Sequence, residues 1–269
     1  MVSFPHCKIN LGLRVVEKRG DGYHSIETCF YPVPRTDILE VIKAEEFAFT
    51  TSGLPVAGLP EQNLCVKAYQ LLANDFKLGP VKIHLHKILP MGAGVGGGSA
   101  DAAFMLRTLN SLFQLKLSQE QLKSYAVELG SDCAFFLQDQ PMLAEGRGEV
   151  LSAAPVSLKG KYLVLVKPNV HVATADAYAS VVPAKPIHKL SDILQQPITR
   201  WREQLVNDFE ASIFKKFPAI ADLKRQLYNN GAVYASMSGS GASVFGIFDA
   251  PVDLRSKFNH VDYWAGTLG

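Results

Sequence analysis

Apolar and polar residues alternate along several short stretches of this chain, which is the pattern of β-strands. In the clearest example every second residue from Cys7 to Val15 is apolar, while Lys8, Asn10 and Arg14 fall on the opposite face. A strand of this kind presents its lysine and asparagine on the polar side of a sheet. Strands are predicted in this way at residues 7–15, 81–87 and 161–168, and, interrupted by prolines, between residues 31 and 53.

Apolar residues at helical spacing predict helices between these strands. The helix with the strongest signal follows a glycine-rich loop, and Ser99 is its expected N-cap. Its buried stripe is expected to consist of Ala102, Leu106, Leu109 and Phe113. Because helices and strands mix without regular βαβ alternation, the predicted fold class is α+β. Further helices are predicted at 63–76, from Ser118 to Gly130, near 205–217 and near 220–229, and a strand, small-residue loop and strand at 232–248.

The composition is that of a compact globular protein and restricts the possible functions. Of 269 residues, 48% are hydrophobic and 19% are charged, which argues against disorder. A formal net charge of +2 is too small to predict nucleic-acid binding. No apolar run approaches the length of a membrane span, and the N-terminus lacks a secretory pattern. With four scattered cysteines at no zinc-binding spacing, the protein is expected to be cytoplasmic, without a nucleic-acid or membrane partner. The sequence does not predict its oligomeric state.

The segment LPMGAGVGGGSADAAFML, residues 89–106, concentrates glycines directly before a predicted helix. Glycine in quantity lowers stability through the backbone entropy lost on folding. The first N–H groups of a helix lack partners and its dipole adds positive charge, so such a junction favours bound phosphate. We therefore interpret the segment as a phosphate-binding loop rather than a flexible surface loop.

Three common phosphate-binding motifs do not account for this loop. A Walker A loop would close with Gly-Lys-Ser/Thr, and this loop contains no lysine. A G-x-G-x-x-G spacing begins at Gly92, but the acid expected about 20 residues later would be Glu120, which falls in a predicted helix. The H-R-D and D-F-G segments of protein kinases are missing. A phosphate site of another kind is predicted.

Several segments resemble the GHMP kinase superfamily, the small-molecule kinases of galactose, homoserine, mevalonate and phosphomevalonate. PMGAGVGGGSADAA at 90–103 is similar to the second motif of that family. Two departures are one extra residue between Pro5 and Lys8, and Ala100 after Ser99 where many members have a serine pair. The following segments, in the same order, resemble the branch whose acceptor is a cytidine-diphosphate ester of methylerythritol: 7–28, 129–137 (LGSDCAFFL), 144–149 (AEGRGE), 207–210 (NDFE) and 237–248.

The resemblance implies a fold of two α+β domains with the active site between them. The N-terminal domain, resembling ribosomal protein S5, would span residues 1–155. The C-terminal domain, which would be ferredoxin-like, would span residues 156–269, consistent with a change of sequence texture around residues 155–160. The implied activity is ATP-dependent phosphorylation of the 2-hydroxyl of the methylerythritol acceptor.

The resemblance also assigns the catalytic pair. Asp132 follows Gly-Ser and precedes the apolar run CAFFL, where a helix cap or a satisfied core acid is the alternative to catalysis. By resemblance Asp132 is the general base, and Lys8 lies beside it, keeps it ionised and favours the alkoxide.

The implied cofactors are ATP and Mg²⁺, and no protein ligand of the metal is assigned. Asp101 could hold the ion or could simply complement the dipole of the helix. By resemblance Asn63 and Lys87 lie near the adenine, and Gly239 and Gly241 form a second loop against the phosphates. The residues expected to surround the triphosphate are Pro90, Met91, Gly92, Ala93, Gly94, Val95, Gly96, Gly97, Gly98, Ser99 and Ala100.

The cytidine end of the acceptor is assigned in the same way. Tyr23 and Tyr178 would sandwich the cytosine, and His24 would contact its edge. Thr174 would offer a hydrogen bond, and Asn10 would contact the substrate beside Lys8. Two other classes stay open: another GHMP kinase of the homoserine or mevalonate type, and a nucleotide-binding module without catalysis.

Overall fold

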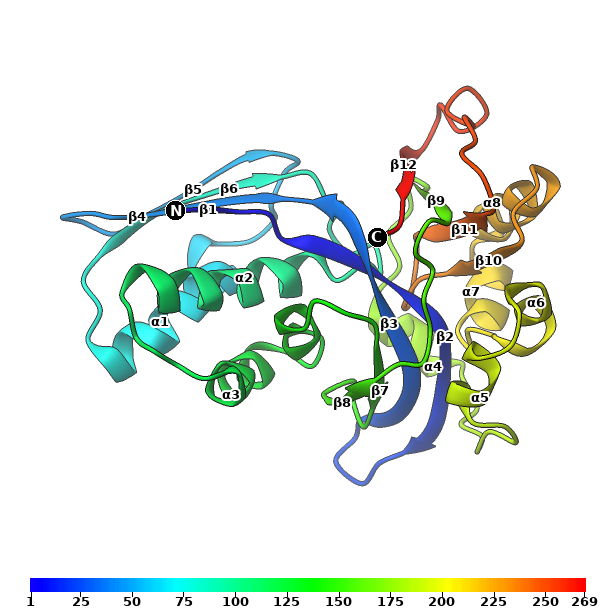
Figure 1. Cartoon of the computed structure of the whole chain (residues 1–269), viewed down its shortest axis with the longest axis horizontal. Coiled ribbons are helices and arrows are strands. Elements are labelled where there is room, and N and C mark those ends of the chain that lie inside the picture. Colours follow the sequence, from blue (N-terminus) through cyan, green and yellow to red (C-terminus); the bar gives the residue numbers. More distant parts are fainter. The chain divides into compact units, whose positions relative to one another are not determined.

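The computed structural model describes the whole chain, residues 1–269, and the chain divides into two compact units (Figure 1). Each unit is built from several separate segments of the chain, and the domain boundary predicted at residue 155 stays a prediction. The first unit consists of Met1–Cys7, Arg35–Met91 and Gly96–Asp139; the second consists of Lys8–Pro34, Gly92–Val95 and Gln140–Gly269.

The first unit contains a four-stranded sheet of order β1-β4-β6-β5. Strands β4 and β6 are antiparallel, whereas β5 and β6 are parallel. Helices α1, α2 and α3 lie on one side of this sheet and pack against one another (Figure 1). The alternating segment predicted at 81–87 is strand β6 with those bounds. The elements are β1 Val2–Ser3, β4 Ile38–Lys43, β5 Ala48–Gly53, β6 Val81–Lys87, α1 Leu64–Phe76, α2 Gly97–Leu112, α3 Gln119–Leu129, and the 3₁₀ helices η1 Pro60–Gln62 and η2 Cys133–Leu137.

The second unit contains two four-stranded sheets, of orders β2-β3-β7-β8 and β10-β11-β9-β12. Strands β9 to β12 pair antiparallel, and α8 packs against β10 and β11 over an apolar core. The strands are β2 His6–Lys18, β3 His24–Thr36, β7 Met142–Glu145, β8 Val150–Ala153, β9 Tyr162–Lys167, β10 Tyr234–Met237, β11 Val244–Phe248 and β12 Asp262–Thr267. The helices are α4 Thr174–Ala179, α5 Leu190–Leu194, η3 Ile198–Arg200, α6 Trp201–Gln204, α7 Glu210–Lys216 and α8 Pro218–Asn229.

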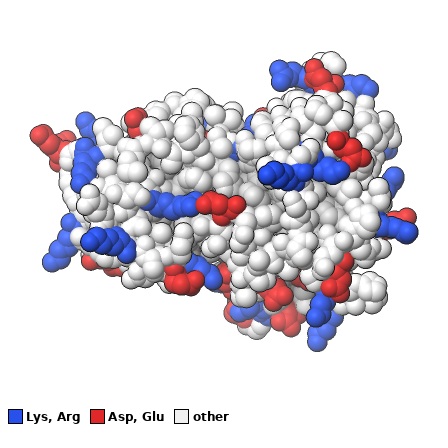
Figure 2. Space-filling view, viewed as in Figure 1, with Lys and Arg blue, Asp and Glu red and all other residues white.

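Several predicted elements are confirmed by their local chemistry. Ser118 and Gln121 form a capping box at the start of α3, and Gly130 is its C-cap. The segment 232–248 contains the antiparallel pair β10 and β11, joined by the small-residue loop. None of the helices combines the length and the apolar character that a membrane span requires. On the face shown in Figure 2, cationic and anionic side chains are scattered among uncharged ones.

Predictions about three elements are wrong. Phe113, expected in the buried stripe of the helix after the glycine loop, is instead the half-buried C-cap of α2. The N-cap of α2 is Gly96, not Ser99, because the left-handed backbone of Gly96 (φ 72°) lets the helix begin at Gly97. Strand β3 runs from His24 to Thr36 through Pro32 and Pro34, and both prolines lie outside the stretch Thr28–Phe30 that pairs with β7.

The third error concerns the helix predicted near 205–217. Helix α6 ends at Gln204 and α7 begins at Glu210, so the first five residues of the predicted helix are not helical. Asn207 instead forms an isolated parallel bridge with Leu13 of β2. The N–H of Leu13 donates to the carbonyl of Val206, and the N–H of Asp208 donates to that of Leu13. Pairing with β2 therefore replaces the helical hydrogen bonds here.

Candidate active site

The glycine loop joins the end of β6 to the start of α2. The backbone conformation alone requires three of its glycines, because Gly92, Gly94 and Gly96 have positive φ values. A Cβ atom on Gly97 would lie 3.1 Å from Nζ of Lys87, so this glycine permits the first turn of α2 to pack closely against the lysine side chain. At Gly98 the nearest atom to a Cβ would be Cδ1 of Leu64 at 3.9 Å. Gly98 is therefore the helical glycine at which a Cβ would meet only an ordinary van der Waals contact.

A second loop, Ser238–Gly241, packs directly against the first within the second unit. The hydroxyl of Ser238 donates to the carbonyl of Gly94 at 2.9 Å, and the N–H of Ser243 donates to that of Ala93 at 3.2 Å. Gly239 and Gly241 both have positive φ values. The two predicted phosphate loops thus form one backbone assembly.

Lys8 is tied to this assembly through Asn10. Only 3% of Lys8 is exposed, and its Nζ donates to Oδ1 of Asn10 at 2.5 Å and lies 4.8 Å from the ring centroid of Phe30. The same Asn10 oxygen accepts a hydrogen bond from Ser238 at 3.4 Å. The amide nitrogen of Asn10 donates to Thr28. Both faces of this part of β2 are buried, so Lys8 is not the solvated lysine that a strand usually carries.

A buried ion cluster supports the loop in the first unit. Nζ of Lys87 lies 2.5 Å from Oδ2 of Asp37 and 2.7 Å from Oδ2 of Asp101, and Lys87 is 1% exposed. The other oxygen of Asp37 accepts hydrogen bonds from the N–H groups of Ile88 and Leu89. The cluster therefore fixes the end of β6, the entry to the loop and the first turns of α2 together.

Burial and neighbouring charges shift the pKa values in this cluster. Burial acts to lower the pKa of Lys87, but the carboxylates of Asp101 and Asp37 outweigh it and the pKa lies above its usual value. Burial raises the pKa of Asp101 to about 7, against the attraction of Lys87 and with the repulsion of Asp37. Oδ1 of Asp101 is buried without a hydrogen-bond partner. The predicted roles of Asp101 overlooked this pairing, because its partners are distant in sequence.

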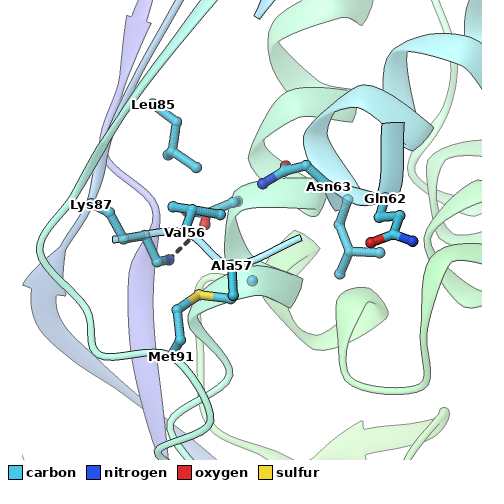
Figure 3. Close-up of a pocket in the computed structure, with 10 residues that line it drawn as sticks. Val56, Ala57, Gln62, Asn63, Leu85, Lys87 and Met91 are labelled. Carbon is cyan, nitrogen blue, oxygen red and sulfur yellow. Dashed lines mark hydrogen bonds and ion pairs between the residues drawn. The ribbon is translucent and has the colours of Figure 1, made fainter. Parts of the chain in front are cut away.

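A pocket opens beside the ion cluster, within the first unit. Its volume is about 120 Å³, enough for several water molecules. Figure 3 shows Leu85 and Lys87 of β6 on one side of it and Gln62 and Asn63 on the other, with the dashed line marking the Lys87 ion pair. The lining residues are Val56, Ala57, Gln62, Asn63, Leu64, Leu85, Lys87, Met91, Gly98 and Asp101.

The pocket brings together two residues that were predicted to lie near the adenine, Asn63 and Lys87. Their polar groups are already engaged: Oδ1 of Asn63 caps α1 by accepting from the N–H of Cys65, and the ammonium of Lys87 is ion-paired. Met91 and Gly98 of the glycine loop line the same pocket. Mostly apolar walls with few polar groups suit a flat heterocycle.

Asp132 also belongs to the first unit, where it directly precedes η2. Its side chain makes no capping hydrogen bond, so the helix-cap alternative does not describe its geometry. Helix η2 packs against α2, and its first residue, Cys133, is hydrogen-bonded to Ser99 in the first turn of α2. Asp132 is thus adjacent in sequence to a residue held against the glycine loop's helix. Its pairing with Lys8, which belongs to the second unit, stays a prediction.

The predicted cytidine residues all belong to the second unit. The rings of His24 and Tyr178 stack with centroids 4.9 Å apart, and the guanidinium of Arg147 lies 5.0 Å from the ring centroid of Tyr23, which is exposed. Oγ1 of Thr174 lies 3.4 Å from Oγ of Ser240 in the second loop. The structure therefore brings His24 and Tyr178 together, while the predicted sandwich of a base between Tyr23 and Tyr178 stays a prediction.

Two structural residues of this region were not assigned a role from the sequence. Ser238 links the two loops, and the side chain of Asn207 donates hydrogen bonds to the carbonyls of Met237 and Gly239 at the second loop. The sequence signals were present, because both residues fall in segments that match the family pattern. Ser238 contacts a residue 144 positions away in sequence, and Asn207 contacts residues 30 and 32 positions away. The pattern alone therefore did not show what they touch.

Comparisons with known proteins agree with this arrangement. The model of the GHMP kinases N terminal domain matches residues 63–144, and that of the GHMP kinases C terminal domain matches residues 190–261. A protein of Bacteroides fragilis named 4-diphosphocytidyl-2-C-methyl-D-erythritol kinase is 52% identical over 263 residues, with 96% of each chain covered. A protein of the same name from Cytophaga hutchinsonii is 53% identical over 250 residues, with 93% of each chain covered.

Solved structures agree as well. A crystal structure of 4-(cytidine 5'-diphospho)-2C-methyl-D-erythritol kinase has a TM-score of 0.85 at 30% identity, covering 100% of this chain and 99% of that chain. The homoserine kinase of Cytophaga hutchinsonii has a TM-score of 0.70 at 16% identity, covering 98% and 94%, which shows a shared fold alone. The chain is an α+β small-molecule kinase and belongs to the 4-diphosphocytidyl-2-C-methyl-D-erythritol kinases of the GHMP kinase superfamily.

Proposed function

We propose that this chain transfers the γ-phosphoryl group of ATP to the 2-hydroxyl of 4-diphosphocytidyl-2-C-methyl-D-erythritol. The observation that carries the proposal is the network in which Lys8, Asn10 and Ser238 are joined by hydrogen bonds. It connects a buried lysine on β2 to the two glycine loops. A buried ammonium held beside backbone loops is suited to developing negative charge on oxygen.

The proposed roles follow from charge and geometry. Asp132 accepts the proton of the 2-hydroxyl while the hydroxyl oxygen forms its bond to the γ-phosphorus and the bond to the bridging oxygen of ADP breaks. The ammonium of Lys8 stabilises the developing alkoxide and keeps Asp132 ionised. The free N–H groups at the start of α2 and the loop Ser238–Gly241 hold the phosphates, because helix N-termini favour anions.

The base of the nucleotide is assigned to the pocket beside Lys87. Its apolar walls would enclose the ring, with Asn63 and Lys87 lining it as the resemblance implies. The cytosine of the acceptor is assigned to Tyr23, His24 and Tyr178, with Thr174 and Asn10 as hydrogen-bonding groups toward the substrate.

The requirement for Mg²⁺ rests on the resemblance alone. No group of three or more His, Cys, Asp or Glu side chains is placed to hold a metal ion, and Asp101 has one oxygen in an ion pair with Lys87. These side chains therefore form no metal site of their own, and no step of the mechanism is assigned to the ion. Mg²⁺ commonly reaches kinases bound to the substrate phosphates.

A substrate panel tests the proposal. The purified chain is incubated with Mg·ATP and, in turn, the cytidine diphosphate acceptor, homoserine, mevalonate and galactose, and release of ADP is followed. Rapid turnover is expected only with the first, and ³¹P NMR of the product should show a new phosphomonoester at the 2-position. Faster turnover of homoserine or mevalonate would favour another GHMP kinase, and nucleotide binding without turnover of any acceptor would favour a module without catalysis.

A further inference from the structure

The segment Asn207–Glu210 matches the family pattern but takes no part in the proposed chemistry. Only 3% of Asn207 is exposed, and its carboxamide is fully engaged by backbone groups. Nδ2 donates to the carbonyls of Met237 at 2.8 Å and Gly239 at 2.9 Å, while Oδ1 accepts from the N–H of Phe209 at 3.0 Å. Both donors of one buried amide are therefore directed at the second glycine loop and the strand that enters it.

The loop held by Asn207 in turn holds the first glycine loop. Ser238 lies between the two carbonyls that Asn207 binds, and its hydroxyl donates to the carbonyl of Gly94. A Cβ atom on Gly239 would lie 3.0 Å from that same carbonyl oxygen, so the backbones are already in close contact. A shift of Gly239 must therefore move Gly94 or break its contact with Ser238.

The other end of the segment is fixed to β2. Oδ2 of Asp208 accepts a hydrogen bond from the N–H of Val15 at 2.8 Å, beside the backbone bridge between Leu13 and Asn207. Oε1 of Glu210 accepts from the N–H of Met237 at 2.8 Å. The segment is thus anchored to the strand that carries Lys8. Its side chains Asn207 and Glu210 bind the second loop and the end of β10 that enters it.

From this geometry we propose that Asn207 is a positioning residue, which sets the place of both glycine loops for the nucleotide phosphates without touching the nucleotide. The inference rests on the proposed function, because it takes the two loops as the phosphate site. Its test measures phosphate binding in the absence of any phosphoryl acceptor, so the two can fail separately.

The decisive variant is Asn207→Asp. It keeps the size of the side chain and an oxygen for the N–H of Phe209, but it loses both donors and turns a carboxylate toward two carbonyls. We expect the Kd of Mg·ATP, measured by titration calorimetry, to rise about tenfold or more, and the Kd of adenosine, measured by competition, to change less than about twofold. In steady state KM for ATP should rise, while KM for the acceptor stays near its original value.

Asp208→Asn is the matched control. It changes the adjacent side chain, retains an oxygen for the N–H of Val15 and contacts neither loop. Its Mg·ATP affinity should equal that of the unchanged chain. Should Asn207→Asp fail to fold, Asn207→Ser replaces it, because this variant removes both amide donors without burying a carboxylate. The same selective loss of Mg·ATP affinity is expected there.

The outcomes separate the inference from its alternatives. An unchanged ratio of Mg·ATP to adenosine affinity in a folded variant overturns it. A fall in melting temperature with both ligands weakened equally means a structural role only and also overturns it. If the selective loss is found but the unchanged chain does not phosphorylate the cytidine acceptor, the inference stands and the proposed function fails.

Discussion

The carbonyl oxygen of Ser238 lies 2.0 Å from the position that a Cβ atom on Gly94 would occupy. No non-bonded carbon can approach an oxygen so closely. The oxygen belongs to the backbone of Ser238, so the clash cannot be relieved by turning a side chain. Gly94 also has a φ of 74°, which side chains disfavour. The glycine is thus required by the packing of one loop on the other, whatever the loops bind.

Gly94→Ala should therefore destabilise the fold as well as abolish Mg·ATP binding. We expect a loss of at least about 2 kcal/mol in the free energy of unfolding, from the clash and the strained φ together. Gly98→Ala is the contrasting variant, because its Cβ would make only an ordinary van der Waals contact with Leu64 and α2 would gain helix propensity. It should unfold no more easily than the unchanged chain yet bind Mg·ATP more weakly. Urea unfolding and calorimetric titration of both variants check this, and equal stabilities would contradict it.

The ion cluster under the loop should be a large contributor to stability in its intact form. Lys87→Met leaves Asp37 and Asp101 buried without their shared cation, so we expect a loss of about 3–5 kcal/mol in the free energy of unfolding. Lys82→Met, on the exposed face of the same strand, is the control and should change the free energy little. Urea unfolding at pH 7 measures both. A loss below about 1 kcal/mol for Lys87→Met would mean that the cluster is not intact in solution.

The raised pKa of Asp101, about 7, predicts a pH-dependent stability. An unfolded aspartate titrates near 4, so between about pH 4 and pH 7 the folded chain keeps a proton that the unfolded chain has lost. The contribution of this group to the free energy of unfolding should therefore fall as pH rises through that window. Asp101→Asn removes the titration. The difference in unfolding free energy between the two proteins, measured at pH 5 and pH 8, should shift against the unchanged chain at pH 8; a constant difference would exclude the raised pKa.

The proposed catalytic pair predicts non-additive losses. Asp132→Asn should fold and bind Mg·ATP but lose about a hundredfold or more in kcat, because general-base and electrostatic effects act in the same transition state. Lys8→Ala should lose a similar factor, and the double variant should be little worse than either. Steady-state kinetics with the cytidine acceptor decide the matter, and near-normal kcat in Asp132→Asn would remove it from the mechanism.

The stacked pair of His24 and Tyr178 gives a prediction for the acceptor's base. Stacking on an aromatic ring contributes roughly 1–3 kcal/mol per base, so Tyr178→Ala should raise KM for the cytidine acceptor about five- to a hundredfold. Affinity for Mg·ATP should stay nearly unchanged. Tyr178→Phe keeps the ring and should behave like the unchanged chain. Equal kcat/KM for cytidine and uridine analogues would argue against a cytosine pocket.

Local sequence patterns predicted much of the fold, because they reflect interactions within one element. Strand β6 has the predicted bounds and α3 is capped by Ser118 and Gly130 as predicted, since alternation and capping are set by neighbouring residues. The start of α2 and the break before α7 depend on remote partners. Helix α2 begins after Gly96 because this glycine takes a left-handed conformation, which the capping preference of Ser99 does not predict. Asn207 pairs with Leu13 of β2, almost two hundred residues away in sequence.

The candidate site shows the same limit. Its glycines and its lysines were recognisable from the sequence, whereas what they touch was not. Three charged residues separated in the chain, Asp37, Lys87 and Asp101, meet only because the junction of β3 and β4, the end of β6 and the first turns of α2 lie together. A single sequence shows residue types and their spacing, but the partners in a long-range ion pair stand at no characteristic spacing, so the pair cannot be predicted from it.

The four cysteines of this chain are all buried, at positions spread over its sheets and helices: Cys7 in β2, Cys29 in β3, Cys65 in α1 and Cys133 in η2. Burial raises the pKa of the Cys7 and Cys133 thiols to about 12, and it raises those of Cys29 and Cys65 as well. With a pKa near 12, on the order of one thiol in a hundred thousand is ionised at pH 7. An alkylating reagent therefore reacts at each site mainly when that segment opens to solvent. The rate of labelling at Cys133, next to Asp132, therefore measures how often η2 opens to solvent, separately from the opening of the strands that carry Cys7 and Cys29.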